Sequence, residues 1–486
     1  MNTMKKILTL LFAFIVMTST MNAQETEPDY LCFEVEAGTT ISLATLSWYT
    51  SNYTYVFKND VNIQYSFDKK NWSTLKYNKI NVETDCNIYF KGTNTCFYKI
   101  DEEEKKIYAV HFVVSKSFKC SGNIMTLIDE IGETTTLTEK YAFAHLFEAT
   151  PITTAPKLPA LVLSTLCYEY MFYECRNLIA APELPATTLS SGCYSNMFHH
   201  CENLTTAPEL PATTLASSCY STMFSHCESL TTAPELPATT LASNCYTEMF
   251  SYCESLTVAP KLPATTLASS CYLAMFTYCK SLIIAPKLPA TTLASSCYTY
   301  MFEGCSNLLI APELPATILA ERCYEQMFSE CKSLTTTPIL PANELKSACY
   351  RGMFGGCSNL EKTAPILFEA PHSSKISSGW ERMFVYCNKL KYMSVRFNKW
   401  TYNSNYGDIY ITKQWVLGVN NGSGTFVCPS TLPKEYSEDC IPFGWTVKSL
   451  DEIIGYNIRV TDLQKITLLL LKQWRLKLVQ KFILLL

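Results

Sequence analysis

The chain has 486 residues, of which 48% are hydrophobic and 17% are charged, a composition typical of a folded protein rather than a disordered one. Its 39 basic and 43 acidic residues give a formal net charge of -4 without a basic stripe, which argues against nucleic-acid binding. The length exceeds what one ordinary core supports and suits a quasi-linear stack joined to a separate domain.

Residues 1–23 predict an export signal. Lys5 and Lys6 precede the apolar run ILTLLFAFIVM, and small and polar residues follow up to Ala23, the expected cleavage point. A lipid anchor is not expected, because the first cysteine, Cys32, lies well behind the apolar run and inside a predicted strand. We therefore expect an exported protein that is at the cell surface, associated with the outer membrane or secreted.

Residues 24–120 predict an all-β sandwich domain. Short alternating runs such as YLCFEVEAG, CNIYFKG and AVHFVVS are separated by the turn-like stretches DKKNW and KGTNT. Residues 121–123 mark the joint with the next region, and no long flexible linker separates the two.

Residues 121–395 contain eight consecutive copies of a 26-residue unit, and the copy that begins at Cys219 reads CYSTMFSHCESLTTAPELPATTLASN. Cys, Tyr, Met-Phe, a second Cys, Leu and Pro-x-Leu-Pro-Ala recur at fixed offsets, whereas the positions between them vary. This pattern predicts stacked units with a constant interior, including core ladders of Tyr and Phe, and a variable exterior. Degenerate units begin near Ala142 and Gly379, as expected of terminal coils that have only one neighbour.

Each unit predicts one short helix and one strand. The stretch TTLASSCYSTMFSHC places Cys, Met and Cys at i, i+4 and i+8, with Tyr and Phe at i+1 and i+5, and these spacings favour an amphipathic helix. The stretch SLTTAPELP contains proline and β-branched threonine and favours a short strand. The predicted fold is therefore an α/β solenoid of strand-plus-helix coils, about 45 Å long at about 4.8 Å per coil.

The 23 cysteines would ordinarily indicate a disulfide framework in an exported protein. Most lie in two columns, eight residues apart in each unit, and on a helix that spacing spans about 12 Å, too far for a bridge within a unit. Stacking brings equivalent cysteines to about 5 Å, but parallel side chains have the wrong orientation for a disulfide. We expect these cysteines to be buried free thiols.

Two variable columns contain candidate binding residues. The first lies between Pro and Leu of the strand segment, and its mixture of charges predicts that it faces solvent. Either it selects a partner by charge complementarity, or it is only a solvated edge that prevents pairing with other chains. The candidates in this column are Glu183, Glu209, Glu235, Lys261 and Lys287.

The second variable column immediately precedes the second Cys of each unit. His200 and His226 lie in it, with His199 adjacent, and a zinc site is one hypothesis for them. We predict no metal, because the neighbouring cysteines belong to constant columns that recur without histidine. Tyr252 and Tyr278 offer rigid aromatic contact area for a protein or sugar, although surface aromatics without a role fit the pattern too.

Residues 396–450 are expected to cap the stack, and residues 451–486 form a predicted amphipathic tail. In the tail Ile466, Leu470 and Trp474 follow helical spacing, but interspersed lysines and an arginine argue against a membrane span. The tail is expected either to lie on a membrane surface or to pack against the last coil. Membrane contact is predicted for no other part of the mature chain.

The repeat segment MFSHCESLTTAPELP resembles the AFxxCxxLxxxxIP unit of BspA-like leucine-rich repeat proteins of anaerobic bacteria, over about residues 141–390. The segments YLCFEVEAG, SGNIM, GTFVCP and IPFGWTV are similar to flanking segments of that family's secreted members. Two departures are the 26-residue length, where about 23 is common, and Met in place of Ala before the Phe. The resemblance implies a leucine-rich-repeat-like solenoid that binds host or bacterial surface proteins, or glycans, and it implies no catalytic residues.

The sequence contains no G-x-S-x-G elbow, phosphate loop, H-E-x-x-H pair or zinc-type cysteine quartet. We therefore predict no enzyme activity and no cofactor, and interpret the chain as an adhesin-like binding protein. Two other interpretations stay open. One is a structural envelope or spacer protein without a dedicated ligand, and the other is a carbohydrate-binding accessory protein that presents aromatic residues to glycans.

Overall fold

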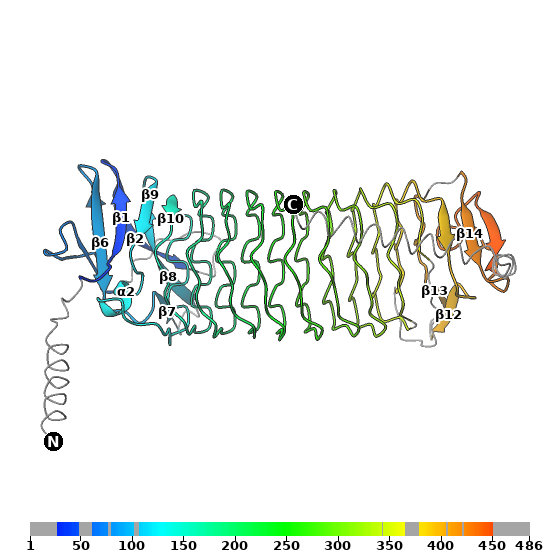
Figure 1. The fold of residues 1–486 in the computed structure, drawn as a ribbon, viewed down its shortest axis with the longest axis horizontal. Coiled ribbons are helices and arrows are strands. Elements are labelled where there is room, and N and C mark those ends of the chain that lie inside the picture. Colours follow the sequence, from blue (N-terminus) through cyan, green and yellow to red (C-terminus); the bar gives the residue numbers. More distant parts are fainter. Residues whose placement is uncertain are drawn as a thin grey trace, which may run out of the picture.

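The computed structural model describes residues 27–47, 61–75, 79–101, 106–342, 344–364, 379–404, 407–419 and 422–450. The predicted export signal and the predicted amphipathic tail lie outside the described residues. Two β-sheets at one end lead into a long stack of coils, which ends at a small sheet (Figure 1). Within the described ranges, no helix has both the length and the apolar character needed to cross a membrane.

The first region is made of two sheets that face each other. One has the strand order β10-β9-β1-β6-β3-β4 and the other β5-β2-β8-β7, and all pairs are antiparallel except β9 with β10. Phe33 of β1 packs against Phe112 of β8 with ring centroids 5.0 Å apart, so the two sheets share one core. The strands are β1 (Leu31–Val35), β2 (Thr40–Ser47), β3 (Ile63–Ser66), β4 (Ser73–Thr74), β5 (Ile80–Asn81), β6 (Cys86–Gly92), β7 (Tyr98–Asp101), β8 (Lys106–Val114), β9 (Phe118–Ser121) and β10 (Ile152–Thr154).

The sheets pass into the stack without a gap in the core. β10 belongs to the first coil and pairs in parallel with β9 of the sheets. The backbone N–H groups of Phe97 and Phe112 donate to the carbonyls of Ala142 and Leu146 in that coil, each at 3.0 Å. Phe112 also stacks on Phe147, with centroids 5.7 Å apart. The first region therefore covers one end of the stack.

The predicted helix of each repeat unit is wrong. The described residues of the repeat units contain no helix, α2 (Thr126–Asp129) precedes the repeats, and the fold is mostly sheet and turns. In place of a helix, each unit contains a chain of consecutive β-turns, here called the turn ribbon, which spans residues 218–227 in the unit of Cys219. The α/β assignment made from the sequence is therefore corrected to a nearly helix-free stack.

The turn ribbon satisfies its backbone donors in two alternating ways. Met223 N–H donates to the Tyr220 carbonyl three residues earlier at 3.3 Å, and Phe224 N–H donates to the Met249 carbonyl of the following coil at 2.9 Å. The same alternation accounts for every N–H from 218 to 227. Every fourth residue has a positive φ, 55° at Thr222 and 59° at His226, which excludes a right-handed helix.

Along the turn ribbon, two side chains that point into the core alternate with two that point outward. Its inward side chains therefore recur every four residues, which is also the spacing of one face of a helix. Stacked coils form the expected core ladders: Tyr220 lies 5.8 Å from Tyr246 at 9°, and Phe224 lies 5.7 Å from Phe250 at 6°. These rings are buried.

All 23 cysteines are in the described residues and all are free. Those of the repeat columns are buried, as expected, although the helical spacing on which the expectation was based is absent. The second column has a further role, because each thiol donates to the Phe carbonyl of the preceding coil, as Cys253 Sγ does to Phe224 at 3.1 Å. Burial raises the pKa of the Cys253 thiol, so it keeps the proton that it donates.

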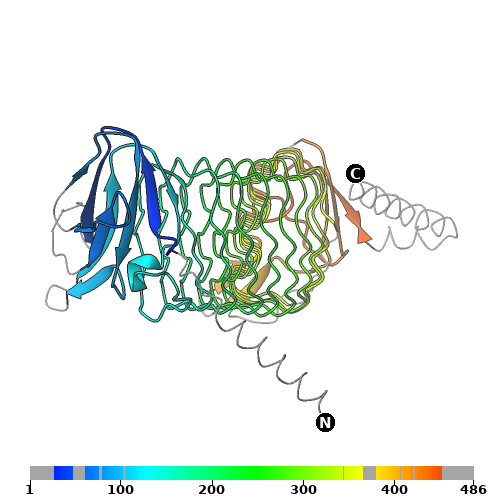
Figure 2. The same ribbon diagram turned by 60° about the vertical axis from the view of Figure 1, so that its left-hand side comes forward.

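The other side of each coil, here called the extended side, is tied to its neighbours by isolated bridges. Thr232 pairs with Val258, Val258 with Ile284, and Ile284 with Ile310, all in parallel. The predicted strand shrinks to about one bridging residue because a proline, which has no N–H to donate, follows two residues later. Figure 2 shows the coils following one another with similar outlines.

Beyond the last full unit the stack continues through longer coils. β11 (Tyr392–Ser394), β14 (Thr425–Cys428) and β15 (Thr446–Ser449) form a parallel sheet, and β12 (Thr401–Ser404) and β13 (Gly407–Tyr410) form a hairpin. The Phe ladder ends at Phe384, whose ring meets Trp415 edge-on. In the last turn ribbon Gln414 N–H donates to Asp439 Oδ1 at 2.6 Å, so this donor has a side-chain partner in place of a further coil.

Candidate binding surface

The column that precedes the second Cys of each unit forms a row of stacked rings on the outside of the turn ribbons, here called the aromatic row. The His200 and His226 centroids are 4.3 Å apart, His226 and Tyr252 4.4 Å, and Tyr252 and Tyr278 4.9 Å. All four side chains are half-buried, and all four residues have φ between 56° and 60°, which projects them in the same direction. Four of the predicted site residues thus come together.

The aromatic row ends where glycine follows tyrosine. A Cβ atom at Gly304, which has a φ of 70°, would lie 2.5 Å from Cδ1 of Tyr278. Any larger residue there would displace the Tyr278 ring. Burial, together with Glu303 and Glu330, raises the pKa of Tyr278, so its hydroxyl stays protonated and can donate to a ligand.

The charged column occupies a different part of the coil. Its residues lie on the extended side and are exposed, as their mixture of charges predicts. The structure does not place them in the aromatic row, and within the described ranges none of the five forms an ion pair. These residues are Glu183, Glu209, Glu235, Lys261 and Lys287.

An exposed aliphatic patch was missed by reasoning from the sequence. Val258, Ile284 and Ile310 follow one another along the bridges of the extended side and are 64%, 58% and 59% exposed, and Ile283 and Leu309 adjoin them. Contiguous exposed aliphatic side chains often mark interaction sites. The available signal was that neighbouring units have threonine in these columns, as a solvent-facing position would, whereas three consecutive units have valine, isoleucine or leucine.

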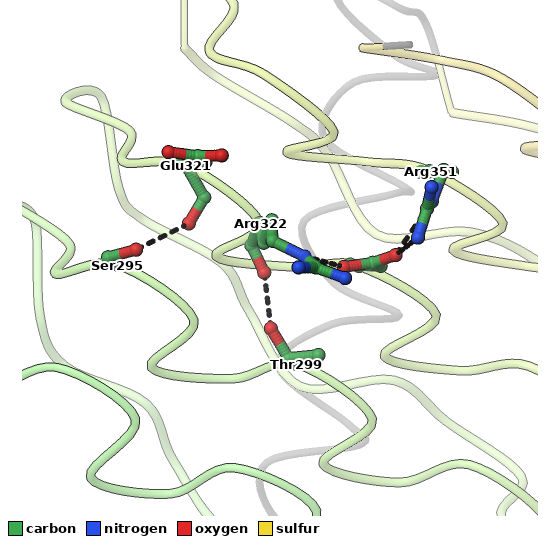
Figure 3. Close-up of polar contacts among 6 residues, drawn as sticks. Ser295, Thr299, Glu321, Arg322 and Arg351 are labelled. Atoms are coloured by element: carbon green, nitrogen blue, oxygen red, sulfur yellow. Dashed lines mark hydrogen bonds and ion pairs between the residues drawn. The ribbon is translucent and has the colours of Figure 1, made fainter.

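A buried carboxylate with two arginine partners lies farther along the turn ribbons (Figure 3). The Glu325 side chain has no exposed surface, and Arg322 Nε and Arg351 Nε donate to its two oxygens at 2.6 Å each. Both guanidinium groups remain partly exposed. The cluster therefore links two coils and leaves one positive charge in excess at the surface.

A matching carboxylate occurs in the same column of the first full unit, without arginine. Burial raises the pKa of Glu169 to about 7, and its Oε2 atom is buried with no hydrogen-bond partner. The two glutamates thus have different surroundings, since Glu325 has two arginine partners and Glu169 has a buried oxygen without a hydrogen-bond partner. A buried carboxylate without a cationic partner is costly, and this cost raises the pKa of Glu169.

Three histidines offer ring nitrogens to one point at the start of the aromatic row. One ring nitrogen each of His199, His200 and His226 lie within 4.8 Å of one another. The adjacent thiols take no part, because Cys201 Sγ and Cys227 Sγ donate to core carbonyls at 3.1 and 3.2 Å. The structure thus adds His199 to the pair considered from the sequence and removes the cysteines.

Comparison of the chain with protein-family models, with curated proteins and with solved structures gives no match. The resemblance of the repeat unit to BspA-like leucine-rich repeat proteins therefore stays a prediction. The surfaces of the stack are the basis for a functional proposal.

Proposed function

We propose that this chain is an exported, adhesin-like binding protein whose coils form a leucine-rich-repeat-like solenoid of the BspA-like kind. It presents the outer face of its turn ribbons to a protein of a host or bacterial surface. The observation that carries the proposal is the aromatic row, in which four consecutive coils place stacked rings in register. Rigid aromatic side chains lose little conformational entropy on binding and are enriched among the residues that dominate interface energies.

The aliphatic patch supports a protein as the ligand. Five exposed aliphatic side chains on three neighbouring coils, Val258, Ile283, Ile284, Leu309 and Ile310, offer apolar area that a polar sugar does not need. A spacer without a ligand would do better with uniform small polar residues at such positions. Protein binding therefore accounts for two surfaces of the stack at once.

Carbohydrate binding is the second candidate, favoured by the aromatic row alone. Rings that stack on one another leave their edges and hydroxyls outward, and a glycan would use these polar groups with the ring edges. In that case the aliphatic patch would make no contribution to binding. The two candidates thus differ in which surface a substitution would affect.

The test is a binding screen of residues 24–486 against arrays of extracellular matrix proteins, bacterial surface proteins and glycans. The Tyr252→Ala, Tyr278→Ala double variant should weaken binding to the captured protein at least about tenfold, the loss of one typical hot spot. Its thermal unfolding should stay near that of the unchanged protein, because both rings are half-exposed.

The matched variant is Ile284→Thr with Ile310→Thr, which installs the residue of Thr232 and Thr336 in the same column. Weaker protein binding in this variant supports a protein ligand at both surfaces. If the protein captures a glycan, and the threonine variant binds it as tightly as the unchanged protein does, carbohydrate binding is favoured. Unchanged affinity of the tyrosine variant, or no ligand for the folded unchanged protein, contradicts the proposal.

A further inference from the structure

The three histidines at the start of the aromatic row come from two successive coils. His199 and His200 are neighbours in one turn ribbon, and His226 occupies the position of His200 in the next. Ring centroids are 4.5 Å apart for His199 and His200, 5.6 Å for His199 and His226, and 4.3 Å for His200 and His226. Stacking in one column brings His200 and His226 together, and the adjacent His199 adds a third ring nitrogen within 4.8 Å of the other two.

One of the rings is already oriented by a hydrogen bond. His199 Nδ1 lies 3.3 Å from Asn196 Oδ1, an acceptor, so the proton of His199 belongs on Nδ1. This tautomer leaves the Nε2 lone pair unprotonated. Ligating histidines are commonly held in this way by a hydrogen bond from the other ring nitrogen.

Burial and nearby charges both act on the three histidines. Burial and the two other histidines lower the pKa of His199 to about 4, and burial and His200 lower the pKa of His226. The carboxylates of Glu202 and Glu254 act on His226 in the opposite direction, so negative charge is close enough to offset a dication.

We propose that His199, His200 and His226 bind one divalent transition metal ion of the zinc class at the surface of the turn ribbons. Zinc bonds to imidazole nitrogen at about 2.0–2.1 Å, which places tetrahedral ligand atoms about 3.3 Å apart. The stacked rings of His200 and His226 must therefore tilt, and their half-exposed position leaves room for it. Three protein ligands leave the fourth position open to water or to a group of a bound partner.

The site is tested with the untagged full-length protein, titrated with Zn²⁺ alone by calorimetry. One Zn²⁺ should bind per chain and raise the midpoint of thermal unfolding, whereas Mg²⁺, which prefers oxygen ligands, should do neither. His226→Tyr should abolish this binding. It installs the residue of Tyr252 in the same column, so ring stacking and the fold are kept.

Two further variants separate ligands from a supporting residue. His199→Ser, which copies Ser225 of the next unit, should also abolish binding. Asn196→Thr, which copies Thr222, should lower the affinity for Zn²⁺ by about 10–100-fold, the usual effect of losing a group that orients a ligand.

Three results would overturn the proposal. The first is equal Zn²⁺ affinity and stoichiometry in the unchanged protein and His226→Tyr. The second is no binding to the unchanged, folded protein. The third is a Co²⁺ complex with thiolate-to-metal charge-transfer absorption, which would place the ion on cysteine.

Discussion

The two sides of each coil are joined to their neighbours in different ways. On the turn ribbon, every N–H of residues 218–227 has a backbone partner, and alternate donors reach the next coil. On the extended side the coils are joined by isolated bridges, such as Thr232 with Val258 and Thr214 with Thr240, and a proline follows Thr232 two residues later. The ties between coils are therefore continuous along the turn ribbon and isolated on the extended side.

This difference separates the two candidate binding surfaces. The aromatic row is built on backbone whose hydrogen bonds are complete, and so its rings are held in position. The aliphatic patch lies on backbone with few bonds, where local opening costs less free energy. The comparison predicts that removing a buried ring from the turn ribbon changes stability far more than changing an exposed residue of the aliphatic patch.

The largest effect is expected for Tyr246→Ala in the turn-ribbon ladder. Tyr246 is 1% exposed between two stacked tyrosines, so its removal should lower the free energy of unfolding by about 3–5 kcal/mol. Val258→Thr on the extended side should stay within about 0.5 kcal/mol. Denaturant unfolding monitored by circular dichroism measures both, and similar losses for the two variants would contradict the comparison.

The next effect depends on pH. Because burial raises the pKa of Glu169 from 4.5 to about 7, the folded state binds the extra proton between these values. The contribution of Glu169 to the free energy of unfolding should therefore be fully present below pH 4.5 and decrease by up to about 3 kcal/mol as the pH rises to about 7.

Glu169→Gln should remove this decrease, so that the variant is more stable than the unchanged chain at pH 8 and similar near pH 4.5. The matched change Glu325→Gln removes a carboxylate that two arginines neutralise, and it should lower stability at pH 8. Thermal unfolding across this pH range is the measurement. An unchanged pH profile in Glu169→Gln would show that Glu169 is ionised without penalty.

A smaller loss is expected for Cys253→Ala. The change removes the thiol that donates to the Phe224 carbonyl, together with buried volume, and should lower the free energy of unfolding by about 1–3 kcal/mol. Cys86→Ala, at a half-buried position of β6, is the control and should cost less than about 1 kcal/mol. Equal losses of unfolding free energy at the two sites would show that the hydrogen bond from the Cys253 thiol adds nothing to stability.

The smallest expected effect is a gain. Thr222 is β-branched, has a φ of 55° and is half-exposed, so Thr222→Gly should relieve backbone strain and raise the free energy of unfolding by about 1 kcal/mol. Gly352 occupies the same column in another unit. Ser221→Gly, one residue earlier without a positive φ, should lower stability by about 0.5–1 kcal/mol, and a gain there would exclude the strain explanation.

The stacking of units and the buried columns could be predicted from sequence, because Cys, Tyr and Phe recur every 26 residues and variable residues do not. The helix could not be excluded, since Cys219, Met223 and Cys227 face inward at i, i+4 and i+8 both on a helix and on a ribbon of four-residue turns. One signal was present: Gly192 and Gly304 occur in outward columns that require a positive φ.

The aromatic row was likewise predictable, because its residues share one column. His199 lies outside that column, and only the turn geometry brings its ring to His226 in the next coil. Of the two arginine partners of Glu325, Arg351 lies in the same column one unit later, whereas Arg322 lies in another column of the same unit, so only the second contact depends on the backbone conformation. Contacts within a column follow from the repeat, whereas contacts between columns need the backbone conformation.

The alternating hydrogen bonds give the stack an electrical direction. Each peptide group that joins two coils turns its N–H toward the carboxy-terminal end and its C=O toward the amino-terminal end, so these dipoles add along the axis. The positive pole meets the carboxylate of Asp439, which accepts from Gln414, and the negative pole meets N–H groups of Phe97 and Phe112. Whole units could be duplicated or deleted between these poles, but the two terminal caps could not exchange places.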